Sequence, residues 1–247
     1  MPNTLVVQTI ILATPLALAA MGGYASERSG VVNIGLEGLM LVAACAAAVA
    51  APKFGPVGAL AIALTITVLI SAVHWLATQI YRIDHVISGM VVNLVAAGGT
   101  NFVASLAKAS SSGVSHLPLV VFEALALTLP FAIWAYVRGT RGGLRLLATG
   151  ADPDKARLAG IVPERVRFAA LVATGVFTGL AGAMLVAFTE GFTNDMTAGR
   201  GYIALAALVL GGWRPLPTLA ACVAFGLLTA LRVQYAGETV LGVSPAY

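Results

Sequence analysis

The 247-residue sequence has little charge and little cysteine. Asp, Glu, Lys and Arg make up 10% of it, against about 25% in an ordinary soluble domain. Hydrophobic residues reach 59%, and the mean hydropathy is +0.94. The two cysteines, Cys45 and Cys222, lie in apolar stretches and imply no disulfide framework. These features exclude a soluble globular domain and predict an all-α polytopic membrane protein.

The sequence also lacks the common signatures of enzymes. None of its three lysines follows a glycine, so it has no phosphate-binding loop. No serine has glycine at both the second position before it and the second after it, as a nucleophile elbow requires. His74, His85 and His116 are too widely spaced for a helical metal pair. We therefore expect no catalytic residues, no metal site and no cofactor.

Long apolar stretches predict about seven to eight membrane segments within one transmembrane domain, residues 1–247. A stretch at 202–213 is too short to cross a bilayer, and the sequence does not decide whether it forms a re-entrant segment. Glycine and proline interrupt the helical pattern at 22–38 and at 191–217. Interruptions at matching positions of two halves are typical of transporters built from an internal repeat, although close helix packing is an alternative. The predicted segments are 4–23, 34–51, 57–81, 86–107, 117–137, 168–189, 202–213 and 215–231.

Half of the basic residues, seven of fourteen, lie in residues 138–168, which we call the basic loop. The formal net charge is +4, but because this loop is flanked by membrane segments and lacks interleaved aromatics, we expect no nucleic-acid partner. An excess of Lys and Arg predicts a cytoplasmic loop. Arg28 and Arg82 then also lie on the cytoplasmic side. The N-terminus lies outside, and so do Lys53, Lys108 and Arg200. No basic residue precedes Arg28, so the first segment is predicted to be an uncleaved span rather than a signal peptide.

The basic loop contains signals for a short helix at 153–159. Asp152 suits the N-cap, Pro153 the first helical position and Gly160 a left-handed stop. Ala156 and Ala159 are predicted to share one small-residue face. A helix of this kind suits docking to a soluble protein, with an ordinary interfacial connector as the alternative.

Several polar residues occur within apolar segments. Glu37 lies between Gly35 and Gly38, one turn after Asn33, and either lines a substrate pathway or bonds to freed backbone N–H groups. In segment 86–107, polar residues predict either a pathway wall or hydrogen bonds between helices. For Glu123 we expect snorkelling to the interface, and for His74 ordinary packing. The candidate pathway residues are Asn33, Glu37, Ser88, Asn93, Thr100 and Asn101, of which Asn93, Thr100 and Asn101 are predicted to share a face.

Four motifs in this order resemble one known family, over about residues 10–236. They are Ser-Glu-Arg-Ser-Gly-Val-Val-Asn-Ile-Gly-Leu-Glu-Gly at 26–38, Ile-Ser-Gly at 87–89 with Asn93, Ala-Thr-Gly-Ala-Asp-Pro-Asp-Lys-Ala-Arg-Leu-Ala-Gly-Ile at 148–161, and Gly-Tyr-Ile-Ala at 201–204 with Gly211, Gly212 and Pro215. The family is the permease subunits of bacterial ABC importers for branched-chain amino acids, ribose and other simple sugars, and nucleosides. The run at 26–38 most resembles the nucleoside and simple-sugar branch.

The resemblance implies a permease of the bacterial inner membrane that moves a neutral, hydroxyl-rich solute, a nucleoside or a simple sugar. It implies a cytoplasmic ATP-binding subunit, a second permease subunit, an extracytoplasmic substrate-binding protein and membrane lipid as partners. An ion-coupled secondary transporter and a membrane scaffold without transport activity are the alternatives. Residues 150–161, the coupling segment, would contact the ATPase through Gly150, Asp152, Pro153, Ala156, Arg157, Ala159, Gly160 and Ile161.

The sequence departs from the family pattern in the coupling segment and at its end. The family usually has an acidic residue at the position of Ala151, Asn at Asp152 and a small residue at Lys155. Its members also usually continue beyond the position of Pro245 into another apolar span, whereas this chain stops at Tyr247. We therefore expect different fine contacts in the segment, and either a truncated C-terminus or a last helix supplied otherwise.

Overall fold

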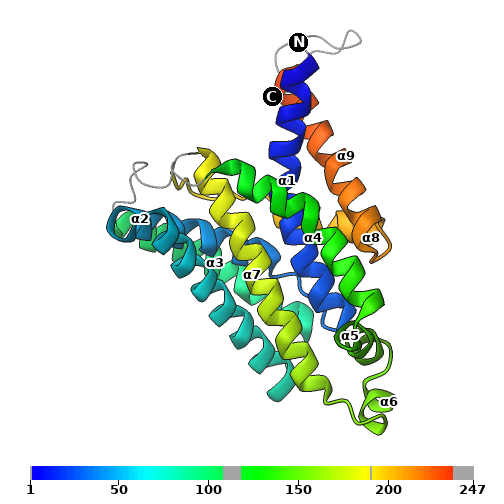
Figure 1. The fold of residues 1–247 in the computed structure, drawn as a ribbon. Helices are drawn as coiled ribbons and strands as arrows, with labels where there is room; N and C mark the ends of the chain where they lie inside the picture. The colour runs from blue at the N-terminus through cyan, green and yellow to red at the C-terminus, as the bar shows by residue number, and fades with distance from the viewer. Residues whose placement is uncertain (1, 108–117, 190, 236–247) are drawn as a thin grey trace.

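The computed structural model describes residues 2–107, 118–189 and 191–235, with side chains from residue 5. Every regular element in these ranges is a helix (Figure 1). In chain order they are α1 (Pro2–Arg28), α2 (Leu36–Trp75) with a π-helical turn η1 (Leu76–Ile80), α3 (His85–Ala107), α4 (Leu119–Gly139), α5 (Arg141–Ala151), α6 (Pro153–Leu158), α7 (Pro163–Thr189), α8 (Arg200–Leu210) and α9 (Pro215–Gln234).

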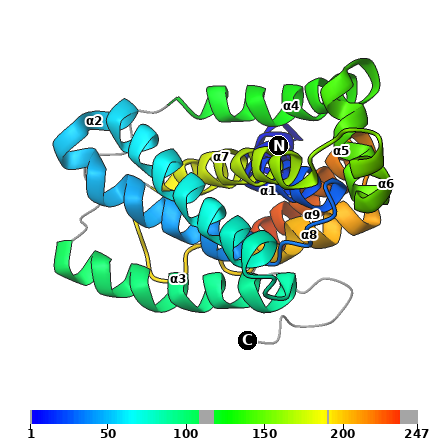
Figure 2. The same ribbon diagram turned by 90° about the horizontal axis from the view of Figure 1, so that it is seen from below.

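Six helical runs in the described ranges are long and apolar enough to cross a membrane, fewer than the seven to eight segments predicted. The difference arises partly at Leu36–Ile80, a single run of 45 residues that contains both the 34–51 and the 57–81 segments. At Gly55 the backbone turns, with φ 68°, and Pro52 and Pro56 lie on either side. Figure 2 shows the second arm of α2 returning beside the first. Helix α8, with 11 residues, is too short to cross.

The centre of the fold is the packing of α7 against α2 and α1. It depends on small residues, because a β-carbon on Gly175 would lie 2.8 Å from the Val68 Cα, and one on Gly179 would lie 2.7 Å from the Thr67 Oγ1. Close approach of backbones is the usual way in which helices associate inside a bilayer. Helix α3 packs mainly on α2 and η1 and lies at the periphery (Figure 2).

The first predicted interruption is narrower than its glycines indicated. Helix α1 continues through Gly22 and Gly23 to Arg28, so the irregular backbone occupies residues 29–35, which we call the linker. The end of α1 is fixed by Gly30 at φ 88°, whose N–H donates to the Glu27 carbonyl. The second interruption consists of turns at 191–199, then α8, then a tight turn at 211–214.

The basic loop holds more helix than the sequence predicted. The 11-residue α5 was not expected, since Gly142, Gly143 and Gly150 lower helix propensity. Its N-cap is Thr140, whose Oγ1 accepts a hydrogen bond from the Gly143 N–H at 3.1 Å. The predicted short helix exists as α6, one residue shorter than expected, and α7 begins at Pro163, five residues before the predicted segment 168–189.

Candidate substrate pathway and coupling surface

Glu37 connects the two interrupted regions. Its carboxylate oxygens accept hydrogen bonds from the N–H groups of Gly199, at 2.8 Å, and Gly201, at 2.5 Å. These N–H groups form the N-terminus of α8, where the helix dipole favours a negative charge. A β-carbon on Gly201 would lie 2.5 Å from the Glu37 Cα, so the glycine is needed for this contact. The backbone N–H groups that bind Glu37 therefore belong to the second interrupted region, and not to the first, in which Glu37 itself lies.

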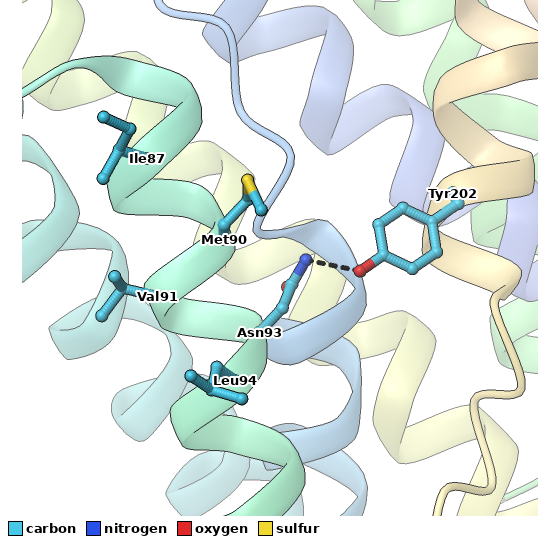
Figure 3. A pocket seen from close by; sticks show the side chains of 6 residues that line it. All are labelled: Ile87, Met90, Val91, Asn93, Leu94 and Tyr202. Carbon is cyan, nitrogen blue, oxygen red and sulfur yellow. Dashed lines mark hydrogen bonds between the residues drawn. The ribbon is translucent and has the colours of Figure 1, made fainter.

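Asn93 fixes the end of the linker. Its Oδ1 accepts from the Gly38 N–H at 2.8 Å, and its Nδ2 donates to the Ile34 carbonyl at 3.0 Å. The same Nδ2 donates to the Tyr202 hydroxyl at 2.9 Å, which joins α3 to α8 (Figure 3). One amide thus holds the linker, the start of α2 and α8 together.

An open hollow of about 580 Å³ lies at this junction. Asn93 and Tyr202 are its polar lining residues, and Tyr202 is 47% exposed, so its ring is accessible. Tyr202 was part of a sequence motif but was not chosen as a site residue. An aromatic residue directly after the glycine at the start of a short helix was the available signal. The remaining lining residues are apolar: Ile87, Met90, Val91 and Leu94.

The other predicted pathway residues do not line this hollow. Asn33 is buried and accepts from the Gly35 N–H at 2.9 Å, while its Nδ2 has no hydrogen-bond partner among the described residues. Ser88 is buried, with its hydroxyl 2.8 Å from the Nδ1 of His74. His74 is therefore a packed, hydrogen-bonded residue, and Ser88 is its partner.

The polar face predicted on α3 is not continuous. Thr100 is buried and donates to the carbonyl of Ala96, one turn back in the same helix. Asn101 is exposed, and Asn93 is half-buried. The three residues therefore occupy different environments, because a step of one residue turns the helix by about 100°.

A second cavity of about 770 Å³ lies between the two arms of α2 and α3. Its described walls are almost wholly apolar, and Lys53, near the bend, is the one charged residue among the described lining residues. A cavity with so few polar groups does not suit a solute rich in hydroxyls. The hollow at Asn93 is the better candidate for a polar solute.

The predicted signals that define α6 are in place. The Asp152 carboxylate accepts from the N–H groups of Asp154 and Lys155, at 3.1 and 3.0 Å. The bond from the Lys155 N–H is the main reason that the pKa of Asp152 is below its ordinary value. Gly160, with φ 77°, ends the helix. Its N–H donates a hydrogen bond to the Arg157 carbonyl, and the Ile161 N–H donates one to the Ala156 carbonyl.

The exposed face of α6 differs from the predicted one. Ala156 is 3% exposed and packs inward, whereas Ala159 is exposed, so the two do not form a shared outer face. Leu158 is 90% exposed instead. An exposed leucine is available for contact with a partner, whereas a buried alanine is not. The sequence signal for Leu158 was an apolar residue among charged ones.

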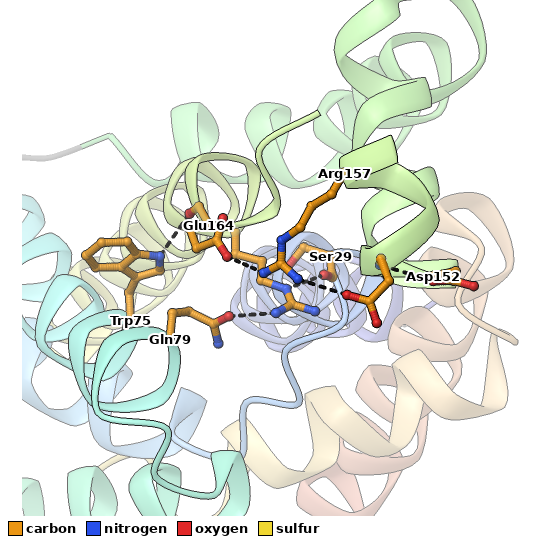
Figure 4. A network of polar contacts seen from close by, with 8 residues as sticks. Ser29, Trp75, Gln79, Asp152, Arg157 and Glu164 are labelled. Carbon is orange, nitrogen blue, oxygen red and sulfur yellow. Dashed lines mark hydrogen bonds and ion pairs between the residues drawn. The ribbon is translucent and has the colours of Figure 1, made fainter. Parts of the chain in front are cut away.

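Arg157 ties α6 to the start of α7. Its guanidinium contacts the Asp154 carboxylate at 2.9 Å and also the Glu164 carboxylate (Figure 4). The hydrogen bond to Glu164 is the largest reason that the pKa of Arg157 is raised. Because Arg157 is exposed, these pairs fix orientation more than they stabilise the fold.

Comparisons with known proteins agree with the fold and the motifs. Residues 5–247 match the family described as "Branched-chain amino acid transport system / permease component". The guanosine ABC transporter permease protein NupQ of Bacillus subtilis is 34% identical, over 94% of this chain and 82% of that protein. A permease protein named for glucose transport, TsgC13 of Haloferax volcanii, is 33% identical, over 92% of this chain and 76% of that protein.

A solved structure shares the fold at low identity. It is an inward-facing conformation of a metal-chelate type ABC transporter, with a TM-score of 0.57 and 14% identity, covering 98% of this chain and 80% of that one. The six apolar helices and the family match make the protein a multi-pass membrane protein that works with an ATPase and other ABC components. The chain belongs to the family of permease components of branched-chain amino acid transport systems, and it is the non-enzymatic membrane permease subunit of an ABC importer.

Proposed function

We propose that this subunit carries a neutral nucleoside, and that the solute passes the hollow at Asn93 and Tyr202. The observation that supports a neutral solute is the bond between Glu37 and the N-terminus of α8. In many transporters the positive end of a broken helix binds an anionic substrate. Here Glu37 already occupies that end, so an anion would have to displace a carboxylate.

The lining of the hollow supports a nucleoside over a sugar. The Tyr202 ring beside apolar side chains from α3 offers a flat apolar surface, which suits the face of a nucleobase. The Asn93 amide can hydrogen-bond to a base edge or to a ribose hydroxyl. The relatives NupQ and TsgC13 are named for guanosine and for glucose, so both solute classes occur in this family.

We also propose that the chain crosses the membrane seven to eight times with its N-terminus outside, in a bacterial inner membrane. The bend at Gly55 gives the 36–80 run two crossings. Helix α8 is about 16 Å long, half of a bilayer core of about 30 Å, so with residues 191–199 it supplies a half-helical crossing. The interrupted helices after α1 and after α7 support an internal repeat. The end of α1, η1, the basic loop and the start of α7 gather at one end of the molecule, as a basic cytoplasmic face requires.

Transport would follow alternating access driven by a separate cytoplasmic ATPase, with a second permease and an extracytoplasmic binding protein. The exposed Leu158 on α6 is the proposed anchor for the ATPase. An ion-coupled mechanism is less well supported, because both carboxylate oxygens of Glu37 already accept backbone hydrogen bonds. A scaffold without transport leaves the family match unexplained.

The test is to express the chain with its neighbouring genes and to measure uptake of labelled guanosine, adenosine and glucose. We expect nucleoside uptake that unlabelled nucleosides inhibit. Leu158→Glu should lose the ATPase on purification, because it places a charge at an apolar contact. Leu144→Glu, at an exposed leucine of α5, is the matched control and should keep it. Uptake of glucose alone would overturn the nucleoside proposal, and retention of the ATPase by Leu158→Glu would overturn the docking site.

A further inference from the structure

Arg167, near the start of α7, binds two segments that are distant in sequence. Its Nη1 donates to the Oε1 of Gln79 in η1 at 2.7 Å, and its Nε donates to the backbone carbonyl of Ser29 in the linker at 3.2 Å (Figure 4). The Nε2 of Gln79 lies 3.2 Å from the Nε2 of His85, the first residue of α3. One half-buried guanidinium therefore joins α7, the end of the α2 run and the linker.

The same turns of α7 hold α6. The Glu164 carboxylate pairs with Arg157 of α6, and the Glu164 backbone carbonyl accepts from the Nε1 of Trp75 at 3.0 Å. Phe168 packs edge-on against Trp75 with ring centroids 5.1 Å apart. The Arg157–Glu164 pair thus ties α6 to the beginning of α7, where Arg167 lies.

The linker leads from Arg167 to the hollow. Ser29 is its first residue, and Ile34, near its end, is held by Asn93, which also binds Tyr202. Glu37 follows within the first turn of α2 and binds α8. The linker is therefore attached to α7 at one end and to the hollow at the other.

We propose that Arg167 is the positioning residue that transmits movement of α6 to the linker, and through it to the Asn93–Tyr202 hollow. This rests on the proposed function, in which the ATPase moves α6. An arginine suits the role because its planar guanidinium holds two acceptors at once in a fixed geometry, which the single ammonium of lysine does not. Without Arg167, α7 would lose its hydrogen bond to the linker, so movement of α6 and α7 would displace the linker less.

The test uses the assembled importer in nanodiscs and needs no substrate. In a background of Cys45→Ala and Cys222→Ala, an environment-sensitive fluorophore is attached at Val32→Cys, an exposed position of the linker. A second version carries it at Lys155→Cys, an exposed position of α6. The measurement is the fluorescence change on adding ATP with vanadate. We expect a change at both positions with native Arg167, and with Arg167→Gln a change at 32 reduced about fivefold or more while that at 155 persists.

Matched variants separate transmission from folding. Arg165→Gln removes an exposed arginine two residues earlier and should leave both changes intact. Gln79→Glu keeps an acceptor oxygen for Arg167 and should retain the fluorescence change at position 32. Gln79→Leu removes the acceptor oxygen and should weaken that fluorescence change. Arg167→Lys, whose ammonium lacks the fixed planar geometry of the guanidinium, should give an intermediate result.

Each outcome decides one question. An unchanged signal at 32 in Arg167→Gln, with a normal signal at 155, would overturn this inference and leave the proposed function standing. Equal loss of both signals together with low recovery of the complex would also overturn it, because Arg167 would then serve folding alone. Absence of any change at 155 with native Arg167 would count against the proposed docking of the ATPase on α6.

Discussion

Gly150 packs directly against the backbone carbonyl of Arg28, so that a β-carbon added at position 150 would overlap that oxygen. Such a carbon would also lie 3.3 Å from the Gly30 N–H nitrogen. The last turn of α5 therefore rests on the end of α1 and the start of the linker. This contact places the basic loop against the segment that leads to Glu37 and Asn93.

The first prediction concerns this contact. Gly150→Ala should lower the free energy of unfolding by about 1–3 kcal/mol, because an added methyl forces α5 away from α1. The measurement is thermal unfolding of the purified protein in detergent. Gly139→Ala is the control, since a β-carbon there meets nothing within 4 Å, and it should be neutral or slightly stabilising. Equal behaviour of the two variants would contradict the prediction.

The second prediction concerns Glu37. Glu37→Gln keeps one acceptor oxygen and should lose one of the two bonds to Gly199 and Gly201, about 1.5–3 kcal/mol for a bond to a charged group. Glu37→Leu loses both and should also lower the amount of folded protein. Thermal stability and nucleoside uptake measured together test this. Glu123→Gln, at a half-buried carboxylate of α4, is the control and should be close to the native protein in both. Native-like stability of Glu37→Leu would show that the α8 cap is not needed.

The third prediction separates Tyr202 from Asn93. Tyr202→Phe removes one hydrogen bond but keeps the ring, so it should raise the KM for nucleoside uptake by about 2–10-fold with little loss of stability. Asn93→Ala removes bonds to Gly38, Ile34 and Tyr202, and should reduce both stability and uptake. Tyr202→Ala, which removes the ring, should raise the KM further than Tyr202→Phe. Uptake that is insensitive to all three would exclude the hollow as the pathway.

The fourth prediction concerns the cap of α6. Asp152→Ala should speed hydrogen exchange at the N–H groups of Asp154 and Lys155 and weaken retention of the ATPase, while Asp152→Asn keeps an acceptor oxygen and should do neither. Because the pKa of Asp152 is lowered in the folded protein, the cap is fully present above the ordinary aspartate pKa of about 3.9 and is lost as the pH falls through the lowered value. Exchange rates in native protein at pH 5 should therefore match those at pH 7 after correction for intrinsic exchange. Faster exchange at pH 5 would argue against the cap.

Local chemistry determined much of this protein from the sequence alone. The scarcity of charge and the length of the apolar stretches predict a helical membrane protein, because backbone groups in a bilayer must be hydrogen-bonded and an apolar stretch of about 20 residues achieves this within one helix. The boundaries of α6 were also predictable to within one residue, since Asp152, Pro153 and Gly160 act on their neighbours in the chain. The family motifs predicted the permease assignment, and the comparisons confirm it.

Tertiary structure decided the contacts between distant segments. Periodicity placed Ala156 and Asn101 on helix faces, but packing decided that Ala156 is buried, that Asn101 is exposed and that Leu158 forms the outer surface of α6. Glu37 was singled out as a costly charge, yet its partners, Gly199 and Gly201, lie far along the chain and have no local signal. The roles of Arg167 and Tyr202 arise in the same way, because a hydrogen bond between distant segments depends on where the whole chain brings their backbones.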